Sequence, residues 1–208
     1  MKLLILLFLF LPSLSFASGK VLFVKGNVMI NKLKPKKGST VKEGDIISTT
    51  KDGLILVKFA SGSTLKVNKE SEVKVQLYKP ENKSTLFTLI KGSGFFRQDP
   101  KVKGKLNVKT RFGAMGVRGT QFFVSYGAQK KDVFMCVNKG SVWVKDKTKK
   151  VTAVNEGEGV VVGKSTSKPQ FLPWTKNLNW RLDPNEGNLE NSAKIEESYK
   201  NPLRQDYD

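Results

Sequence analysis

The sequence predicts an all-β protein: a single domain of many short strands, built as a sandwich, a roll or a short β-solenoid-like stack with two related halves, and followed by an irregular C-terminal tail. Runs rich in β-branched and aromatic residues recur at intervals of roughly 8–12 residues, with Gly, Asn, Asp and Ser between them. Many of these runs alternate apolar and polar residues, which is the period of a strand. In addition, residues 20–165 contain no amphipathic helical pattern.

The first 17 residues have the pattern of a secretory signal peptide. Lys2 precedes a continuous apolar run over residues 3–11, and small residues lead to a cleavage position after Ala17. We favour this interpretation over an uncleaved membrane anchor, because Pro12 interrupts a run that is shorter than the roughly 20 residues a spanning helix needs. We therefore expect a periplasmic or secreted protein with no transmembrane helix after cleavage.

The predicted strands occupy residues 18–165, which we expect to form the domain. The segment EVKVQLY is the clearest strand, since Val73, Val75 and Leu77 fall on one face and the residues between them on the other. Turn residues bound every segment, so each strand is expected to be short. The remaining strands are predicted, in order, in VLFVKGNVMIN, GLILVKF, STLKV, STLFTLIKGSGFF, QFFVSY, DVFMCVNKGSVWVKD and EGVVVG.

Internal similarity supports two related halves. Three segments share the order strand, Lys-Gly turn, strand, at residues 23–30, 89–96 and 137–144. A second unit with a central glycine follows the first and third copies, at residues 40–45 and 153–158. The spacing between copies is irregular, which excludes a regular repeat array. The pattern favours stacked hairpin layers.

Residues 166–208 differ in character, and we interpret them as a C-terminal extension. The segment STSKPQFLPW contains two prolines and is expected to be extended. We expect Trp174 and Trp180 to pack back on the domain as anchors. Residues 188–201 could form one short helix, and the last residues resemble a frayed end.

The charge of the chain limits its partners. Lys and Arg number 37 against 18 Asp and Glu, giving a net charge of +19. Only five of the basic residues are arginine, the residue best suited to bidentate phosphate recognition. This disfavours a nucleic-acid-binding protein. Two alternatives stay open: a solvated surface whose lysines guard strand edges, or a surface attracted to anionic glycans or lipids.

The sequence offers no catalytic site, metal site or cofactor site. Histidine is absent, which removes histidine-based catalysis and metal binding. The single cysteine, Cys136, lies in a strand-like run and is expected to be an inert core thiol, so no internal disulfide can form. The notable carboxylates, Asp45, Asp52, Glu156 and Glu158, each adjoin a turn glycine, where we expect them to bind backbone amides. We therefore expect no enzymatic activity.

The stretch GAMGVRGTQFFV raises the question of a phosphate-binding loop. Its residues Gly113, Gly116 and Gly119 surround Arg118, and Thr120 follows. Phosphate-binding and dinucleotide-binding loops both require a helix next, whereas this stretch continues as a strand. Two interpretations of Arg118 remain. It is either an internal staple between the two halves, bound to backbone carbonyls or a turn carboxylate, or an anion-binding residue.

Taken together, the motifs resemble the FecR domain. The glycines Gly44, Gly53 and Gly62 stand in the first-half motifs, and Asp45 follows Gly44 in an EGDxIxT pattern. The second half contains GxxGVRGTxF. The order of the motifs is right, and the resemblance covers about residues 20–163. The matching segments are 24–28, 41–49, 52–56, 59–67, 108–113, 116–122 and 140–144.

This resemblance implies an all-β extracytoplasmic domain without catalytic activity. In iron-uptake systems such a domain passes a signal from an outer-membrane receptor to a cytoplasmic sigma factor. Those regulators also carry a cytoplasmic anti-sigma segment and a membrane span, and here we expect only a signal peptide before the domain. The resemblance therefore implies a protein-interaction module with an envelope protein as partner more directly than it implies sigma-factor signalling.

Overall fold

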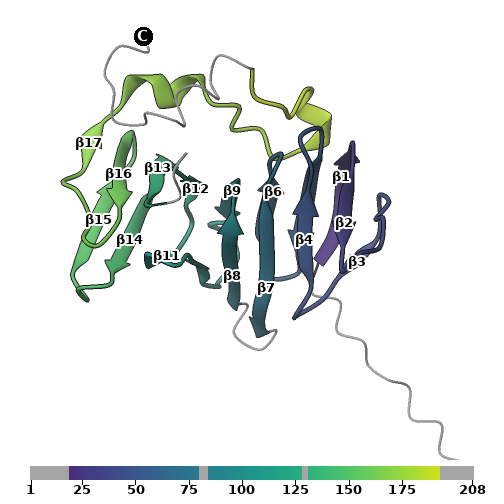
Figure 1. The fold of residues 1–208 in the computed structure, drawn as a ribbon, viewed down its shortest axis with the longest axis horizontal. Coiled ribbons are helices and arrows are strands. Elements are labelled where there is room, and N and C mark those ends of the chain that lie inside the picture. The colour runs from purple at the N-terminus through teal and green to yellow at the C-terminus, as the bar shows by residue number, and fades with distance from the viewer. Residues whose placement is uncertain (1–18, 80–83, 128–130, 193–208) are drawn as a thin grey trace, which may run out of the picture.

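The computed structural model describes residues 19–79, 84–127 and 131–192. Nearly all of the regular structure is β, in two sheets that lie along the same long axis (Figure 1). The predicted all-β class is thus confirmed. The predicted signal peptide and residues 193–201 of the predicted helix lie outside the described residues, and residues 188–192, the described part of that helix, are not helical. Within the described ranges, no helix is long and apolar enough to cross a bilayer.

One sheet has nine strands and the other eight. All strand pairs are antiparallel except β8 with β10, which is parallel. The nine-stranded sheet has the order β17 (Gln170–Phe171), β16 (Glu158–Val162), β13 (Val133–Lys139), β12 (Gln121–Tyr126), β9 (Ser93–Gln98), β6 (Ser63–Val67), β5 (Leu54–Phe59), β1 (Gly19–Lys25) and β3 (Thr40–Val41). The eight-stranded sheet has the order β15 (Val151–Asn155), β14 (Ser141–Asp146), β11 (Gly113–Val117), β10 (Leu106–Lys109), β8 (Ser84–Lys91), β7 (Glu72–Lys79), β4 (Ile46–Thr49) and β2 (Val28–Ile30).

The chain crosses from one sheet to the other at the Lys-Gly turns. β1 leads to β2, β8 to β9 and β13 to β14, and each pair has one strand in each sheet. The turn glycines Gly26, Gly92 and Gly140 all have positive φ. At Gly26 a Cβ would lie 2.1 Å from the carbonyl oxygen of Asp52, so the corner requires glycine. The predicted hairpins at these turns are therefore wrong, because the two strands enter different sheets and do not hydrogen-bond to each other.

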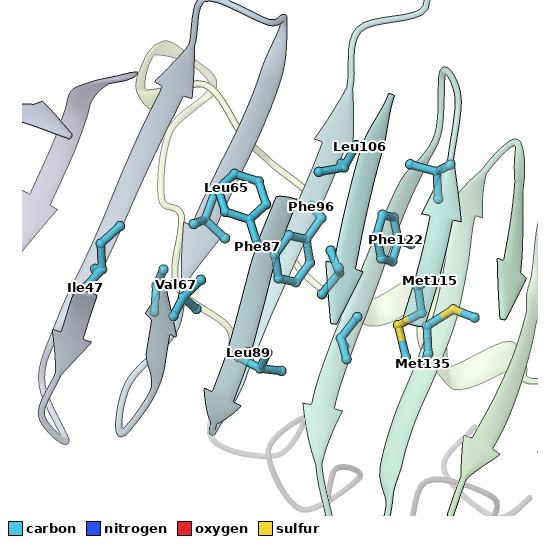
Figure 2. Packing of buried hydrophobic residues seen from close by; sticks show 14 of the residues in the cluster. Ile47, Leu65, Val67, Phe87, Leu89, Phe96, Leu106, Met115, Phe122 and Met135 are labelled. Carbon is cyan, nitrogen blue, oxygen red and sulfur yellow. The ribbon is translucent and has the colours of Figure 1, made fainter. Parts of the chain in front are cut away.

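The main core lies between the two sheets. Its centre is a chain of aromatic rings, with centroid distances of 5.0 Å from Phe59 to Phe87, 5.9 Å from Phe87 to Phe96 and 5.4 Å from Phe96 to Phe122. Figure 2 shows Phe87, Phe96 and Phe122 among aliphatic side chains from both sheets, with Met115 and Met135 on the Phe122 side of the cluster. Inward residues alternate with outward ones along the eight-stranded sheet, as the sequence predicts.

A C-terminal segment, residues 172–192, covers the outer face of the nine-stranded sheet; we call it the strap. It contains two short 3-10 helices, η2 (Pro173–Asn177) and η3 (Pro184–Glu186). Figure 1 shows it running from the β17 end toward β1. Its apolar residues form a second core with side chains from β5, β9, β12 and β13. Trp174 is buried against Phe134 and Trp180 packs edge-on against Phe95, which confirms their predicted anchoring role.

Candidate functional site

The outer face of the nine-stranded sheet carries one charged residue in an otherwise apolar row. Strand register places Leu56, Lys66, Phe95 and Phe123 side by side on four adjacent strands. All four side chains are fully buried. The strap covers this row, so Lys66 lies inside the second core and has no solvent around it.

The ammonium group of Lys66 fastens the strap through three backbone carbonyls. Its Nζ donates to the carbonyl oxygens of Asn179 at 2.5 Å, Arg181 at 3.1 Å and Leu189 at 3.1 Å. Nζ also lies 4.1 Å from the centre of the Phe95 ring. Three carbonyls match the three donors of an ammonium group. A single buried side chain thus joins the middle of the strap and its C-terminal part to the middle of the sheet.

Burial lowers the pKa of Lys66 to about 7, and the charge of Glu186 opposes this shift. The three carbonyls favour the protonated form, whereas desolvation disfavours it. Sequence reasoning missed this residue. The segment STLKV gives Lys66 an outward position in a strand, and only the strap, more than a hundred residues away, makes that position buried. The available signal was the apolar character of its outward neighbours, Leu56 and Phe95, which indicates a covered face.

The strap leaves a groove of about 770 Å³ along the edge of the sandwich. Its floor is formed by the turns that contain Asp52, Asn68 and Ser93, and its wall by strap residues that include Arg181 and Glu190. The rim carries both signs of charge. Glu190 is held in place by an exposed ion pair with Lys25, with 2.7 Å between Nζ and Oε2. The groove therefore offers hydrogen-bonding groups and balanced charges.

A second groove, of about 550 Å³, lies on the other side of the strap. Gln121 binds the strap here, because its Nε2 donates to the carbonyl oxygen of Trp180 at 2.5 Å. Asn138 in turn donates to Oε1 of Gln121 at 3.1 Å. Arg97 and Lys139 line the same groove. The strap is thus fixed by polar contacts on this side as well as by Lys66.

The GVRGT motif forms the corner between β11 and β12. Arg118 is exposed, which differs from the internal position expected of a staple. The fastening residue is Thr120, buried, whose hydroxyl donates to the carbonyl oxygen of Ser141 at 2.9 Å and so joins this corner to the next one. Gly119 has a φ of 67° and lies close to Pro100. Anion binding at Arg118 stays a prediction.

The other motif residues occupy separate turns and do not form one site. Gly53 and Gly62 allow close approaches, since a Cβ would lie 2.5 Å from the carbonyl oxygen of Asn27 at Gly53 and 2.8 Å from Val102 at Gly62. Gly113 and Gly116 lie in β11, where a Cβ at Gly113 would approach the carbonyl oxygen of Lys145 to 2.7 Å. Gly44 has a φ of 90° in the corner before β4.

The carboxylates singled out in the sequence bind turn amides. Asp45 accepts from the backbone amide of Lys42 at 2.7 Å, and Glu158 from that of Asn155 at 2.7 Å. Asp52 accepts from Asn27 and Glu156 from Gly140, both at 3.4 Å. Hydrogen bonds from Thr50 and Asn27 lower the pKa of Asp52. These contacts agree with the predicted turn roles. Among the described residues, no group of three or more Cys, Asp and Glu could hold a metal ion.

Cys136 has the surroundings of an inert thiol. It is fully buried on β13, and burial raises the pKa of the Cys136 thiol well above its usual value. A raised pKa keeps the sulfur protonated, and the thiolate is the reactive form. The structure thus places this residue as the sequence predicts.

Comparison with known proteins identifies the middle of the chain. Residues 45–143 match the family model described as FecR protein, which confirms the resemblance carried by the motifs. Two crystal structures described as a candidate anti-sigma factor from Parabacteroides distasonis ATCC 8503 align with 60% of this chain, at 20% identity and a TM-score of 0.49. This chain covers 57% of that protein's length. No curated protein matches.

Proposed function

With residues 45–143 identified as a FecR domain, we propose that this protein is a non-catalytic extracytoplasmic module that acts by binding a protein of the bacterial cell envelope. The family match is the observation that carries the proposal, because FecR domains serve as regulatory modules in signalling systems. The pattern of residues 1–17 supports the location outside the cytoplasm.

The arrangement of polar groups supports a binding role over catalysis. Asp45 and Glu158 are bound to turn amides, and Cys136 is buried. Lys66, whose pKa is lowered to about 7 by burial, is engaged by three carbonyls of the strap. These groups hold the fold together, and among them no pair of side chains is poised for proton transfer.

The larger groove is the proposed contact surface for the protein partner. It combines charges of both signs with amide and hydroxyl groups, and one of its walls is the strap. Protein interfaces that are not obligate have a comparably mixed polar character. A partner segment lying in this groove would contact the strap and the corner turns at the same time.

Site-directed photo-crosslinking in intact cells tests this proposal. A photo-reactive residue at Lys51, on the groove, should capture a stoichiometric envelope protein, whereas the same residue at the exposed Lys58 on the opposite end of β5 should not. Mass analysis of the purified protein from cells should find Ser18 as its N-terminus. Equal capture at both positions would contradict the proposed surface. A purified protein that still contains residues 1–17 would contradict the proposed location.

A further inference from the structure

The outer face of the eight-stranded sheet is uncovered at the end formed by β10, β11, β14 and β15. Register places Trp143 on β14 between Gly116 on β11 and Ala153 on β15. The next outward position on the same strand is Lys145, between Ala114 and Val151. Inward residues of these strands belong to the main core, so this face is firmly supported from beneath.

Trp143 is a large exposed aromatic side chain, with 52% of its surface accessible. Its neighbours across both strand pairs are Gly116 and Ala153, which rise little above the sheet. Gly116 does not have positive φ, and a Cβ there would meet only the side-chain oxygen of Asn107, at 3.3 Å. The backbone conformation therefore does not demand glycine. Its missing side chain leaves the backbone of β11 without a side chain across from Trp143.

Polar groups lie close to Trp143 and Gly116 in the sheet. Asn107 lies directly across Gly116 on β10. In the row below Trp143, the hydroxyl of Ser141 donates to the side-chain oxygen of Asn155 at 3.0 Å. An aromatic ring with hydroxyl and amide groups around it can stack on the apolar face of a sugar ring while the polar groups bind its hydroxyls.

Basic side chains lie in the next row of this face and at the adjoining end of the sandwich. Lys109 and Lys145 face outward on either side of Ala114. At the adjoining turns, Arg111 and Lys147 lie 4.8 Å and 5.7 Å from the centre of the Phe112 ring. The turn between β14 and β15 adds two further exposed lysines, at positions 149 and 150.

Among the described residues, acidic side chains lie at the two ends of this face: Glu156 and Glu158 bind the backbone amides of Gly140 and Asn155 beyond the Ser141 end, and Asp146 lies at the lysine end. Asp146, the acidic residue within the turn, is buried, and its oxygens accept hydrogen bonds from Thr148 at 2.6 Å and Thr166 at 3.1 Å. In the described part of the chain, neither Lys109 nor Lys145 is in an ion pair. The face therefore combines a supported aromatic surface with a concentration of positive charge.

We propose that this face, formed by Trp143, Asn107, Lys109 and Lys145, with Arg111 and Lys147 at the adjoining end of the sandwich, binds an anionic polysaccharide. A sugar ring stacks on Trp143, and the acidic groups of neighbouring sugars contact the lysines. The proposal does not depend on the protein-partner function, because the larger groove lies along the strap and this face belongs to the other sheet.

The composition of the face favours a glycan over other anions. Proteins that bind single-stranded nucleic acid stack successive bases on several aromatic side chains, whereas here one aromatic residue is exposed among mostly lysine charges. A lipid surface would be met by an apolar edge that inserts below the headgroups. The neighbours of Trp143 are instead small or polar.

A fluorescence titration with an oligomer of galacturonic acid tests the proposal. We expect saturable binding that protects Trp143 from acrylamide quenching and weakens as salt is added. The Trp143→Ala change should weaken binding about tenfold. The double change Lys109→Gln and Lys145→Gln should also weaken binding and should reduce its dependence on salt.

Matched controls lie on the other sheet. Phe171→Ala removes an aromatic side chain of similar exposure from β17. The double change Lys20→Gln and Lys58→Gln removes two exposed lysines that face each other across β1 and β5. Both controls should bind the oligomer as the unchanged protein does, and neutral dextran should not bind.

Four results would overturn the proposal: no binding of the galacturonic acid oligomer, equal losses in the matched controls, tighter binding to phosphatidylglycerol vesicles, or tighter binding to an oligothymidylate. Thermal melting of each variant must show an intact fold. Because Trp143 is half exposed, its replacement by alanine should leave the melting temperature nearly unchanged. A variant that melts normally and binds normally would remove Trp143 from the site.

Discussion

One outer face of this sandwich is covered by another part of the chain, and the other is exposed to solvent. On the nine-stranded sheet, the strap covers Leu56, Phe95 and Phe123 and seals a second core. On the eight-stranded sheet, Trp143 and Lys145 stand in the open. The two sheets share one main core, so their inner faces are equivalent. The two sheets differ in their outer faces, because the strap covers only that of the nine-stranded sheet.

The residue patterns of the strands reflect this difference. β12 is buried at all six positions, whereas β14 alternates buried residues with exposed or half-buried ones. A strand that is apolar on both faces needs cover on both faces. The run QFFVSY in β12 therefore indicates a second layer, and SVWVKD in β14 indicates a solvent-facing side. Each prediction below tests one part of this contrast.

The largest effect should come from removing the strap. Ending the chain after Phe171 would expose the outer face of the nine-stranded sheet. A buried large apolar side chain contributes roughly 1.5–3 kcal/mol, and domains are stable by only about 5–15 kcal/mol. We expect the shortened chain to aggregate or to bind a hydrophobic dye strongly, as dye fluorescence would show. An unchanged melting temperature would contradict the second core. The buried strap residues lost are Leu172, Trp174, Leu178, Leu182 and Leu189.

Two phenylalanines that are adjacent in the chain belong to different cores, Phe96 to the main core and Phe95 to the second core. Phe96→Ala empties a fully buried site in the main core and should lower the free energy of unfolding by about 3–5 kcal/mol, measured by urea denaturation. Phe95→Ala acts on the second core, where its ring meets Trp180 at 5.1 Å. Only the Phe95 variant should shift the fluorescence of Trp180 to the red in the folded state. A red shift in both variants would mean that the cores are not separate.

Replacing the buried lysine should weaken the attachment of the strap. Lys66→Met keeps the apolar stem but leaves the carbonyls of Asn179, Arg181 and Leu189 without their donor. We expect a loss of about 1–3 kcal/mol in urea denaturation. Lys58→Met, at an exposed position on the neighbouring strand, is the matched control and should stay within about 0.5 kcal/mol.

The loss of stability in Lys66→Met should depend on pH in a definite direction. The pKa of Lys66 is about 7 in the folded protein, against 10.5 for an ordinary lysine side chain. Between these values the unfolded chain binds more protons, so the contribution of Lys66 to stability rises with pH from about 7 and is lowest below it. The deficit of Lys66→Met relative to the unchanged protein should thus grow between pH 6 and pH 10. A constant deficit would mean that the lysine keeps its proton throughout.

The smallest effect should come from the exposed arginine of the GVRGT corner. Arg118→Ala should change the free energy of unfolding by less than about 0.5 kcal/mol, because its side chain lies in solvent. Thr120→Val should lower it by about 1–2 kcal/mol, because the carbonyl oxygen of Ser141 then loses its buried donor. The reverse order of the two effects in thermal melting would restore the staple interpretation of Arg118.

The sequence predicted what depends on local spacing. Alternation placed Val73 and Val75 inward, and the bulky character of Trp174 and Trp180 indicated that the tail returns to the domain. The turn at Gly26 was also predictable, since positive φ favours glycine. These features depend on residues that are near one another in the chain, so the pattern contains them.

The missed features depend on distant partners. The sequence of a Lys-Gly turn is the same whether its two strands pair with each other or enter different sheets. The sequence pattern therefore does not distinguish these corners from hairpins. Lys66 occupies an outward strand position that solvent would normally surround. Its burial is decided by strap carbonyls at Asn179 and Leu189, far along the chain. Of the two interpretations of Arg118, the internal staple requires a buried side chain, and the residue is exposed.

The most direct test of the contrast uses the three tryptophans as reporters. Single-tryptophan proteins are made by changing the other two residues to phenylalanine, and acrylamide quenching is measured for each. Trp143 is 52% exposed and Trp174 is 3% exposed, so we predict that Trp143 is quenched several times more strongly than Trp174, with Trp180 in between. Adding Lys66→Met should raise the quenching of Trp180 and leave Trp143 unchanged. Equal quenching at Trp143 and Trp174 would contradict one closed face and one open face.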